Sequence, residues 1–315
     1  MKRLLLLHFI IYLFPLFVSA QNIVQITSNI TSDSKWTADN IYELSGVNFI
    51  YVTNNASLTI EPGTLIKGNP AALVVTRGSK LFAVGTQEKP IVFTSSKPAG
   101  QRAAGDWGGI VFLGKATVNV PGGEGTVEGG LDPVLGKYGG NDDTDNSGIL
   151  KFVRIEFAGI AFQPNNETNG LTLAGVGSGT EISYVQINHG GDDGIEWFGG
   201  TVNGKYLVVN KTLDDMFDTD FGYRGVNQFA IGISDPAIAD ISGSNGFEAD
   251  NDAQGSTNQP FSQSIFTNVT IIGPKQDSTT VINSNYKRGF HLRRSTKQSI
   301  RNSIKNHHYQ PTSCR

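Results

Sequence analysis

The stretch Asp192-Asp193-Gly194-Ile195-Glu196-Trp197-Phe198-Gly199 returns 22 residues later as Asp214-Asp215-Met216-Phe217-Asp218-Thr219-Asp220-Phe221. A weaker copy follows as Gly246-Phe247-Glu248-Ala249-Asp250. The first two copies are each preceded by a short apolar stretch, Tyr184 to Asn188 and then Tyr206 to Asn210, which are again 22 residues apart. A fixed period of this length is typical of stacked structural units.

Two short strands in each unit, separated by Gly, Asn and Asp, leave no room for a helix. The repeat therefore predicts an all-β parallel β-helix, a solenoid of single-chain coils. We expect it over residues 46–300, where short strands of β-branched residues alternate with Gly and Pro. Residues 21–45 are predicted to be an N-terminal strand or cap segment. After Ile300 the sequence loses glycine, acid and strand pattern together, which predicts a disordered tail over 301–315 behind a C-terminally truncated solenoid.

The first twenty residues have the layout of a cleaved secretory signal. Lys2 and Arg3 precede an apolar run that ends in Val18-Ser19-Ala20. We therefore expect an exported protein that begins near Gln21. No other stretch approaches the roughly 20 apolar residues of a spanning helix, so no membrane insertion is expected after cleavage.

Composition restricts the partners. The single cysteine, Cys314, excludes an internal disulfide. Eight of the 25 Lys and Arg residues lie at positions 2–3 and 293–315, which leaves 17 against 28 acidic residues, a net charge of −11, for residues 21–292. An acidic body disfavours nucleic acid and favours cations, cationic surfaces or neutral glycans.

Alternation along each strand sends every second side chain into the solenoid. In the acidic repeat this predicts an inner pile of Ile195, Phe217, Phe247 and Phe290. Their neighbours then form two outward columns, Glu196, Asp218, Glu248 and His291, and Phe198, Asp220, Asp250 and Arg293. For the coil at Phe229 we expect a one-residue slip that turns Phe229, Ile231 and Ile233 inward.

Several motifs in order resemble a known family. They are Gly105-Asp106-Trp107-Gly108-Gly109, the run from Asp145 to Gly159, Asp192 to Gly200, Ser244 to Asn251, and His291-Leu292-Arg293-Arg294. The chain is similar to exported right-handed parallel β-helix proteins, pectin-lyase-like in fold, that are common in Bacteroidetes and mostly uncharacterised. The resemblance implies a right-handed solenoid and an extracellular or cell-surface location, or the periplasm if the C-terminal sorting domain of such proteins is absent.

The acidic columns predict either a calcium site or a solvated, ion-paired surface. Stacked carboxylates about 5 Å apart repel by about 3 kcal/mol per pair at an effective dielectric of about 20. Calcium takes six to eight such oxygens, whereas the alternative places Arg224, Arg293 or Arg294 against Asp220 and Asp250. The candidate ligands are Asp192, Asp193, Glu196, Asp214, Asp215, Asp218, Asp220, Glu248, Asp250 and Asp252.

Two weaker signals remain. Asn141 to Gly148 partly matches a calcium loop but lacks the closing Glu, so a Gly/Asp turn is the preferred interpretation. Trp107, Phe198 and Tyr223 are candidates for an exposed platform that stacks on sugar rings.

The favoured hypothesis is an exported, non-catalytic β-helix with an acidic, calcium-binding face that presents a surface to a glycan or a cell-surface protein. The alternative is a polysaccharide hydrolase or lyase that uses Glu196, Asp218 and Asp220.

Overall fold

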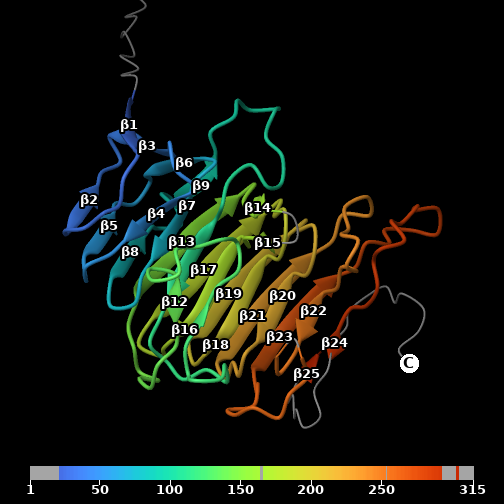
Figure 1. Cartoon of the computed structure of the whole chain (residues 1–315). Coiled ribbons are helices and arrows are strands. Elements are labelled where there is room, and N and C mark those ends of the chain that lie inside the picture. Colours follow the sequence, from blue (N-terminus) through green and yellow to red (C-terminus); the bar gives the residue numbers. More distant parts are fainter. Residues whose placement is uncertain (1–20, 164–165, 253, 293–302, 305–315) are drawn as a thin grey trace, which may run out of the picture.

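The computed structural model describes residues 21–163, 166–252, 254–292 and 303–304. Within them the chain winds into stacked coils whose strands form two large parallel sheets (Figure 1), as the repeat predicts. The described residues contain no helix that is long and apolar enough to span a membrane. The predicted signal at residues 1–20 lies outside the described residues.

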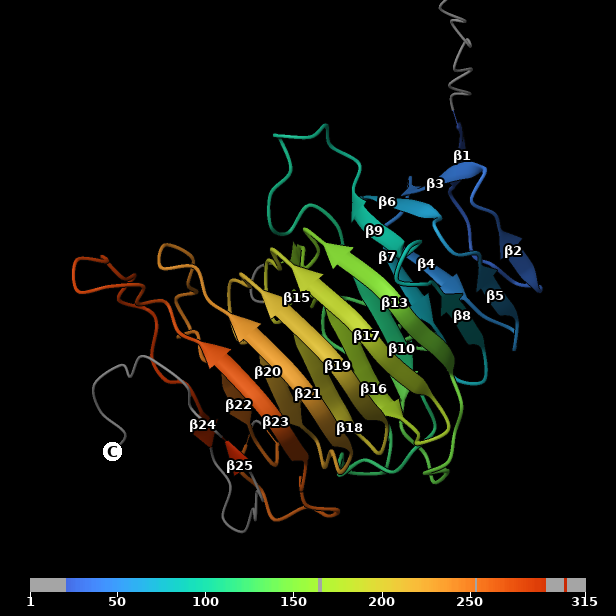
Figure 2. The ribbon, with the colours of Figure 1, turned by 180° about the vertical axis from the view of Figure 1, so that it is seen from behind.

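Sheet A has 13 strands, and Figure 2 shows its later members side by side. Its main path is β1 (Asn22–Ile26), β3 (Asn40–Ser45), β6 (Leu65–Asn69), β9 (Ile91–Ser95), β13 (Gly148–Glu156), β17 (Glu181–Asn188), β19 (Asn203–Asn210), β21 (Val226–Ile233), β23 (Ile265–Ile272) and β25 (Ser303–Ile304). A branch of β2 (Ser34–Trp36), β5 (Ser57–Ile60) and β8 (Lys80–Val84) joins the first half of β13, while β9 pairs with its second half. From β13 onward, each coil contributes one long strand to sheet A, in the place of the two short strands that each earlier coil contributes.

Sheet B has eight strands and carries the acidic repeat. In chain order they are β4 (Phe49–Val52), β7 (Ala72–Val75), β10 (Ile110–Leu113), β16 (Leu171–Val176), β18 (Ile195–Gly200), β20 (Phe217–Asp220), β22 (Phe247–Ala249) and β24 (His291–Leu292). Two antiparallel pairs lie outside the large sheets, β11 (Gly125–Thr126) with β12 (Lys137–Tyr138) and β14 (Ala161–Gln163) with β15 (Asn166–Glu167).

The two ends of the stack differ from the sequence prediction. The coils begin before residue 46, because β1, β2 and β3 already pair in sheet A. Residues 303–304, predicted as part of a disordered tail, instead form β25 beside β23. Residues 301–302 and 305–315 of that tail lie outside the described residues.

The inner pile is confirmed. Parallel pairing puts Ile195, Phe217 and Phe247 in register, all three are at most 2% exposed, and Phe290 packs against the same core. The rings of Phe217 and Phe247 stack with their centroids 5.0 Å apart. Alternation thus fixes which side of sheet B is inside, and it sets the acidic neighbours on the outer side.

The predicted slip at Phe229 is wrong. Phe229 and Ile231 are 37% and 41% exposed, whereas Ala230 is buried and pairs with Leu207. Phe229 has a φ of 60° and extends a stack of rings on the outside of sheet A that runs Phe152, Tyr184, Tyr206, Phe229. A left-handed residue interrupts the strand, so two consecutive side chains point outward and the inward pattern then resumes without a slip.

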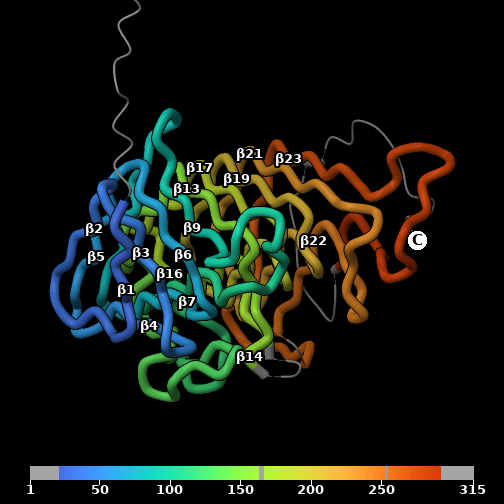
Figure 3. Tube along the Cα trace, turned by 90° about the horizontal axis from the view of Figure 1, so that it is seen from above, coloured from blue at the N-terminus to red at the C-terminus, as the bar shows by residue number. Residues whose placement is uncertain are grey.

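The connection between β10 and β13, residues 114–147, leaves the stack as expected but then packs back on it. We call it the covering segment, and in Figure 3 its green course lies outside the coils near β4 and β14. Its buried Val118, Val127, Leu131 and Tyr138 form a second apolar core with the outer face of sheet B. It forms hydrogen bonds with coils toward both ends of the solenoid. Asp132 N donates to the hydroxyl of Tyr51 in β4 at 2.9 Å, and Asn119 Nδ2 donates to Asn251 O, just after β22, at 2.6 Å.

Candidate metal centre

The second Asp of each Asp-Asp pair has a structural task at the corner before sheet B. Asp193 Oδ1 accepts a hydrogen bond of 2.8 Å from Asp215 N, and Asp215 Oδ1 accepts one from Asn245 N. The bonds satisfy backbone N–H groups that would otherwise be buried without a partner. The repeated Asp-Asp motif therefore holds successive coils together.

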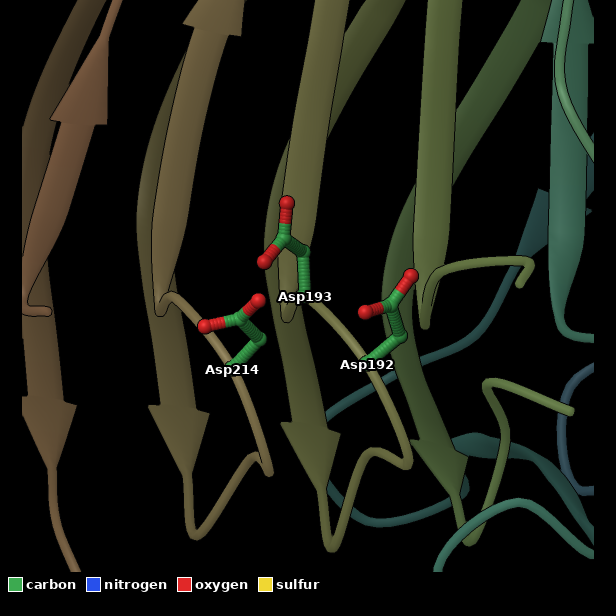
Figure 4. Close-up of side chains that lie close together, drawn as sticks. All are labelled: Asp192, Asp193 and Asp214. Atoms are coloured by element: carbon green, nitrogen blue, oxygen red, sulfur yellow. The ribbon is translucent and has the colours of Figure 1, made fainter. Parts of the chain in front are cut away.

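The same corner brings five carboxylates into two interlocking groups. Carboxylate oxygens of Asp192, Asp193 and Asp214 all lie within 4.8 Å of one another, and so do those of Asp193, Glu196 and Asp218. Figure 4 shows the first group, with the three side chains next to one another at neighbouring coil corners. Calcium–oxygen distances of 2.3–2.6 Å give ligand atoms this separation across one ion. Each group therefore has the span of a cation site.

Within the described part of the chain, four of these five carboxylates have no ion pair with a basic side chain. The four are Asp192, Asp193, Glu196 and Asp218. Arg224, predicted to lie against Asp220 and Asp250, instead contacts Asp143 at 3.2 Å, so that pairing is wrong. Arg293 and Arg294 lie outside the described residues.

Burial makes the charges costly. It is the main cause that raises the pKa of Asp193, Glu196 and Asp218 well above the ordinary carboxyl value, and neighbouring carboxylates add to it. Burial likewise raises the pKa of Asp220 to about 7, against a hydrogen bond of 2.6 Å from Phe221 N that stabilises the charged form. Hard divalent cations bind deprotonated carboxylates and lower this cost.

The predicted outer column has the expected register, since Glu196 pairs with Asp218, Asp218 with Glu248, and Glu248 with His291. It is not an open surface, however. Glu196 of this column and Asp220 of the second column are 6% and 8% exposed, and the charges of both raise the pKa of the buried Tyr138 in the covering segment. The covering segment therefore seals part of the acidic face.

The other predicted ligands contact different groups. His291 Nδ1 lies 3.5 Å from Glu248 Oε2. Asp214, which belongs to the first carboxylate group, also accepts a hydrogen bond of 2.6 Å from Ser242 Oγ at its Oδ2. Asp250 is buried at 5% exposure. Asp252 accepts backbone hydrogen bonds of 3.0 Å from Gln254 and Ser256, so it closes its own loop. Asp252 belongs to neither carboxylate group.

The predicted aromatic platform is wrong. Trp107 and Tyr223 are 0% exposed and Phe198 is 6% exposed, so none can stack on a sugar ring from solvent. Trp107 packs on Phe93 in the solenoid and Tyr223 on Trp197, while Phe198 meets Tyr138 in the second core. Alternation correctly predicts that the Phe198 side chain points away from the solenoid core, but the covering segment packs over it.

The acidic run 141–148 forms turns, as the preferred interpretation held. Asp142 Oδ1 accepts from Thr144 N at 3.1 Å, Asp143 Oδ1 accepts from Thr117 N at 2.9 Å, and Asp145 Oδ2 accepts from Lys115 N at 3.1 Å. The three carboxylates thus bind separate backbone donors.

Sequence reasoning missed Asn169. This side chain is 1% exposed, donates from Nδ2 to Glu196 Oε2, and lies one coil before Asp193 because Gly170 N donates to Asp193 O. The signal was available, since Asn169-Gly170 precedes Asp193-Gly194 by 24 residues.

Comparison with known proteins agrees with this architecture. No curated protein and no solved structure matches the chain. Residues 28–312 match the family described as pectate-lyase-like β-helix domain. Because the match covers most of the sequence, the chain belongs to the pectate-lyase-like β-helix family.

Proposed function

We propose that this protein is an exported, non-catalytic β-helix that binds calcium at the corner before sheet B and presents its surface to a protein on the cell exterior. The observation that carries the calcium site is the pair of carboxylate groups around Asp193. Oxygen-only ligands with no nitrogen or sulfur favour a hard cation.

The choice of a protein partner over a glycan follows from the aromatic side chains. The three predicted sugar-stacking residues are buried. The exposed rings of Tyr184 and Phe229 belong to a row of stacked rings, so that neighbouring rings occupy both faces of Tyr184 and one face of Phe229. Sugar rings stack on aromatic faces, whereas protein side chains also pack against ring edges.

Thermal unfolding tests the calcium site. A ligand at 100 times its Kd stabilises the folded state by about 2.7 kcal/mol, which corresponds to a rise of about 4–5 °C in the melting temperature of a chain of about 300 residues. We expect this rise with calcium relative to a chelator. The variant Asp193→Asn should lose it, while Asp277→Asn, on the loop after β23 and outside both carboxylate groups, should keep it. Equal melting temperatures with calcium and chelator would remove the metal from the proposal.

A polysaccharide hydrolase or lyase is the second candidate. Family membership favours it, and so does the pKa of Asp220 near 7, which suits a general acid. The burial of Glu196 and Asp220 beneath the covering segment opposes it, because a polymer needs an open cleft. Incubation with neutral and acidic polysaccharides, followed by assays for reducing ends and unsaturated products, separates the two functions.

A further inference from the structure

The outer face of sheet A gathers exposed apolar side chains. In the described part of the chain eleven large hydrophobic residues are exposed, and five of them lie on β17, β21 and β23. These five are Tyr184, Val226, Phe229, Ile231 and Ile272. The other six are scattered over other strands and loops. A contiguous apolar surface on a soluble protein is typical of an interaction site, whereas scattered apolar side chains are not.

Strand register joins these side chains into one surface. Ile231 on β21 lies opposite Val208 on β19, and Ile233 lies opposite Ile272 on β23. In Figure 2 the strands from β13 to β23 lie at the front, and no described segment crosses them, because the covering segment packs on sheet B instead. We call this surface the apolar face, and its members are Val208, Val226, Phe229, Ile231, Ile233 and Ile272.

The apolar face has no acidic residue on an otherwise acidic protein. Residues 21–292 hold 17 basic and 28 acidic residues, a net charge of −11, but β19, β21 and β23 contain neither Asp nor Glu. Their one basic residue, Lys205, has its Nζ 5.2 Å from the ring centroid of Tyr206 and 5.6 Å from that of Phe229. Two copies of an acidic protein repel each other. This face lets two copies meet without setting carboxylates against carboxylates.

The size of the surface suits a dimer of moderate affinity. Five neighbouring strands from β13 to β23, spaced about 4.8 Å apart and about eight residues long at about 3.3 Å each, outline roughly 600 Å². A stable interface buries about 600–1,000 Å² on each partner. The apolar face would form its centre, and Lys151, Arg154 and Glu181 on β13 and β17 would form a polar rim.

We infer that a second copy of this chain covers the apolar face, so that the protein dimerises through the outer sides of two sheets A. A two-fold axis sets the same patch on both sides of an interface, and apolar side chains therefore meet apolar side chains. The axis lies near Val208 and Ile231, at the centre of the five strands, which brings the two Ile231 side chains close together. The inference goes beyond the proposed function and does not depend on the calcium site, which lies at the corner before sheet B.

Sedimentation equilibrium of the purified protein at about 1–100 µM tests this inference. We expect a dimer with a dissociation constant in the micromolar range. Ile231→Lys puts a charge at the centre of the interface and should weaken dimerisation by at least about tenfold. Val281→Lys adds the same charge at a side chain that is 88% exposed on the loop after β23, and it should dimerise like wild type. Circular dichroism verifies the fold of each variant.

A mixing experiment tests the two-fold axis. Ile231→Lys and Ile231→Asp should each be monomeric, because two like charges face each other across the axis. An equimolar mixture should recover the dimer, since the Lys of one copy then faces the Asp of the other.

Every outcome bears on the inference. A wild-type protein that stays monomeric at the highest concentration overturns it, and the effect of calcium on melting is unaffected by that result. An Ile231→Lys variant that dimerises like wild type also overturns it, because the contact then lies on another face. Loss of the dimer in Val281→Lys would move the interface to the loops. A mixture that remains monomeric refutes the position of the axis.

Discussion

Asp220 offers a direct measure of the cost of burying the acidic face. Its pKa is raised to about 7 from the ordinary value of 3.8, mainly by burial. A carboxyl with a raised folded-state pKa binds more protons in the folded protein, so stability falls as pH rises between about 4 and about 7. A shift of about three units corresponds to about 4 kcal/mol lost at pH 7.5 and less than about 1 kcal/mol at pH 4.

The perturbation is Asp220→Asn, which removes the charge but keeps an oxygen for the hydrogen bond from Phe221 N. In chelator, we expect the variant to exceed wild type in free energy of unfolding by about 2–4 kcal/mol at pH 7.5, since coupling to Asp250 and Glu248 shares part of the effect. The two proteins should be nearly equal at pH 4. Urea unfolding at both values measures the difference, with Asp277→Asn as the exposed control. A variant that is no more stable than wild type at pH 7.5 would refute the argument from burial.

Three further substitutions test the packing of the solenoid and the anchoring of the covering segment. Trp107→Ala should lower the free energy of unfolding by about 3–5 kcal/mol, because it leaves a cavity and frees Glu156 O, which accepts from Trp107 Nε1 at 2.8 Å. Tyr206→Ala should cost about 1–2 kcal/mol through its two ring stacks, and denaturant unfolding measures both; no loss would show that the outer rings do not stabilise the solenoid. Arg224→Ala removes the ion pair with Asp143, so limited proteolysis should cut the covering segment faster; an unchanged rate would place its anchoring elsewhere.

The repeat could be predicted because it is local. Alternation and the 22-residue period suffice to align Ile195 with Phe217 and Glu196 with Asp218, and the structure confirms both pairings. The position of Phe229 could not be read in this way. The inward positions of its coil fall on the small Ala230 and Gly232, which favoured a slip that would bury larger side chains. In the structure a Cβ at Gly232 would lie 2.2 Å from Met216 Sδ, so a neighbouring side chain fills the space that the glycine leaves.

The burial of the acidic face could not be predicted from the sequence either. Whether Phe198 and Asp220 meet solvent depends on where the covering segment docks, and Tyr138, which covers them, is 60 residues away from Phe198. Alternation tells inside from outside for one sheet, but it does not reveal a second layer. The convergence of Asp192, Asp193 and Asp214 in one group likewise depends on corner geometry that a linear pattern leaves open.

The covering segment also has a consequence for how this solenoid unfolds. In a stack where each coil touches only its neighbours, melting can start at one end and proceed coil by coil. Here the covering segment forms hydrogen bonds with Tyr51, near the first coils, and with Asn251, near the last. Its Asp143 also forms an ion pair with Arg224. Unfolding of any coil that the covering segment contacts also exposes part of the second apolar core. We therefore expect these coils to melt together as one cooperative unit rather than to fray in sequence.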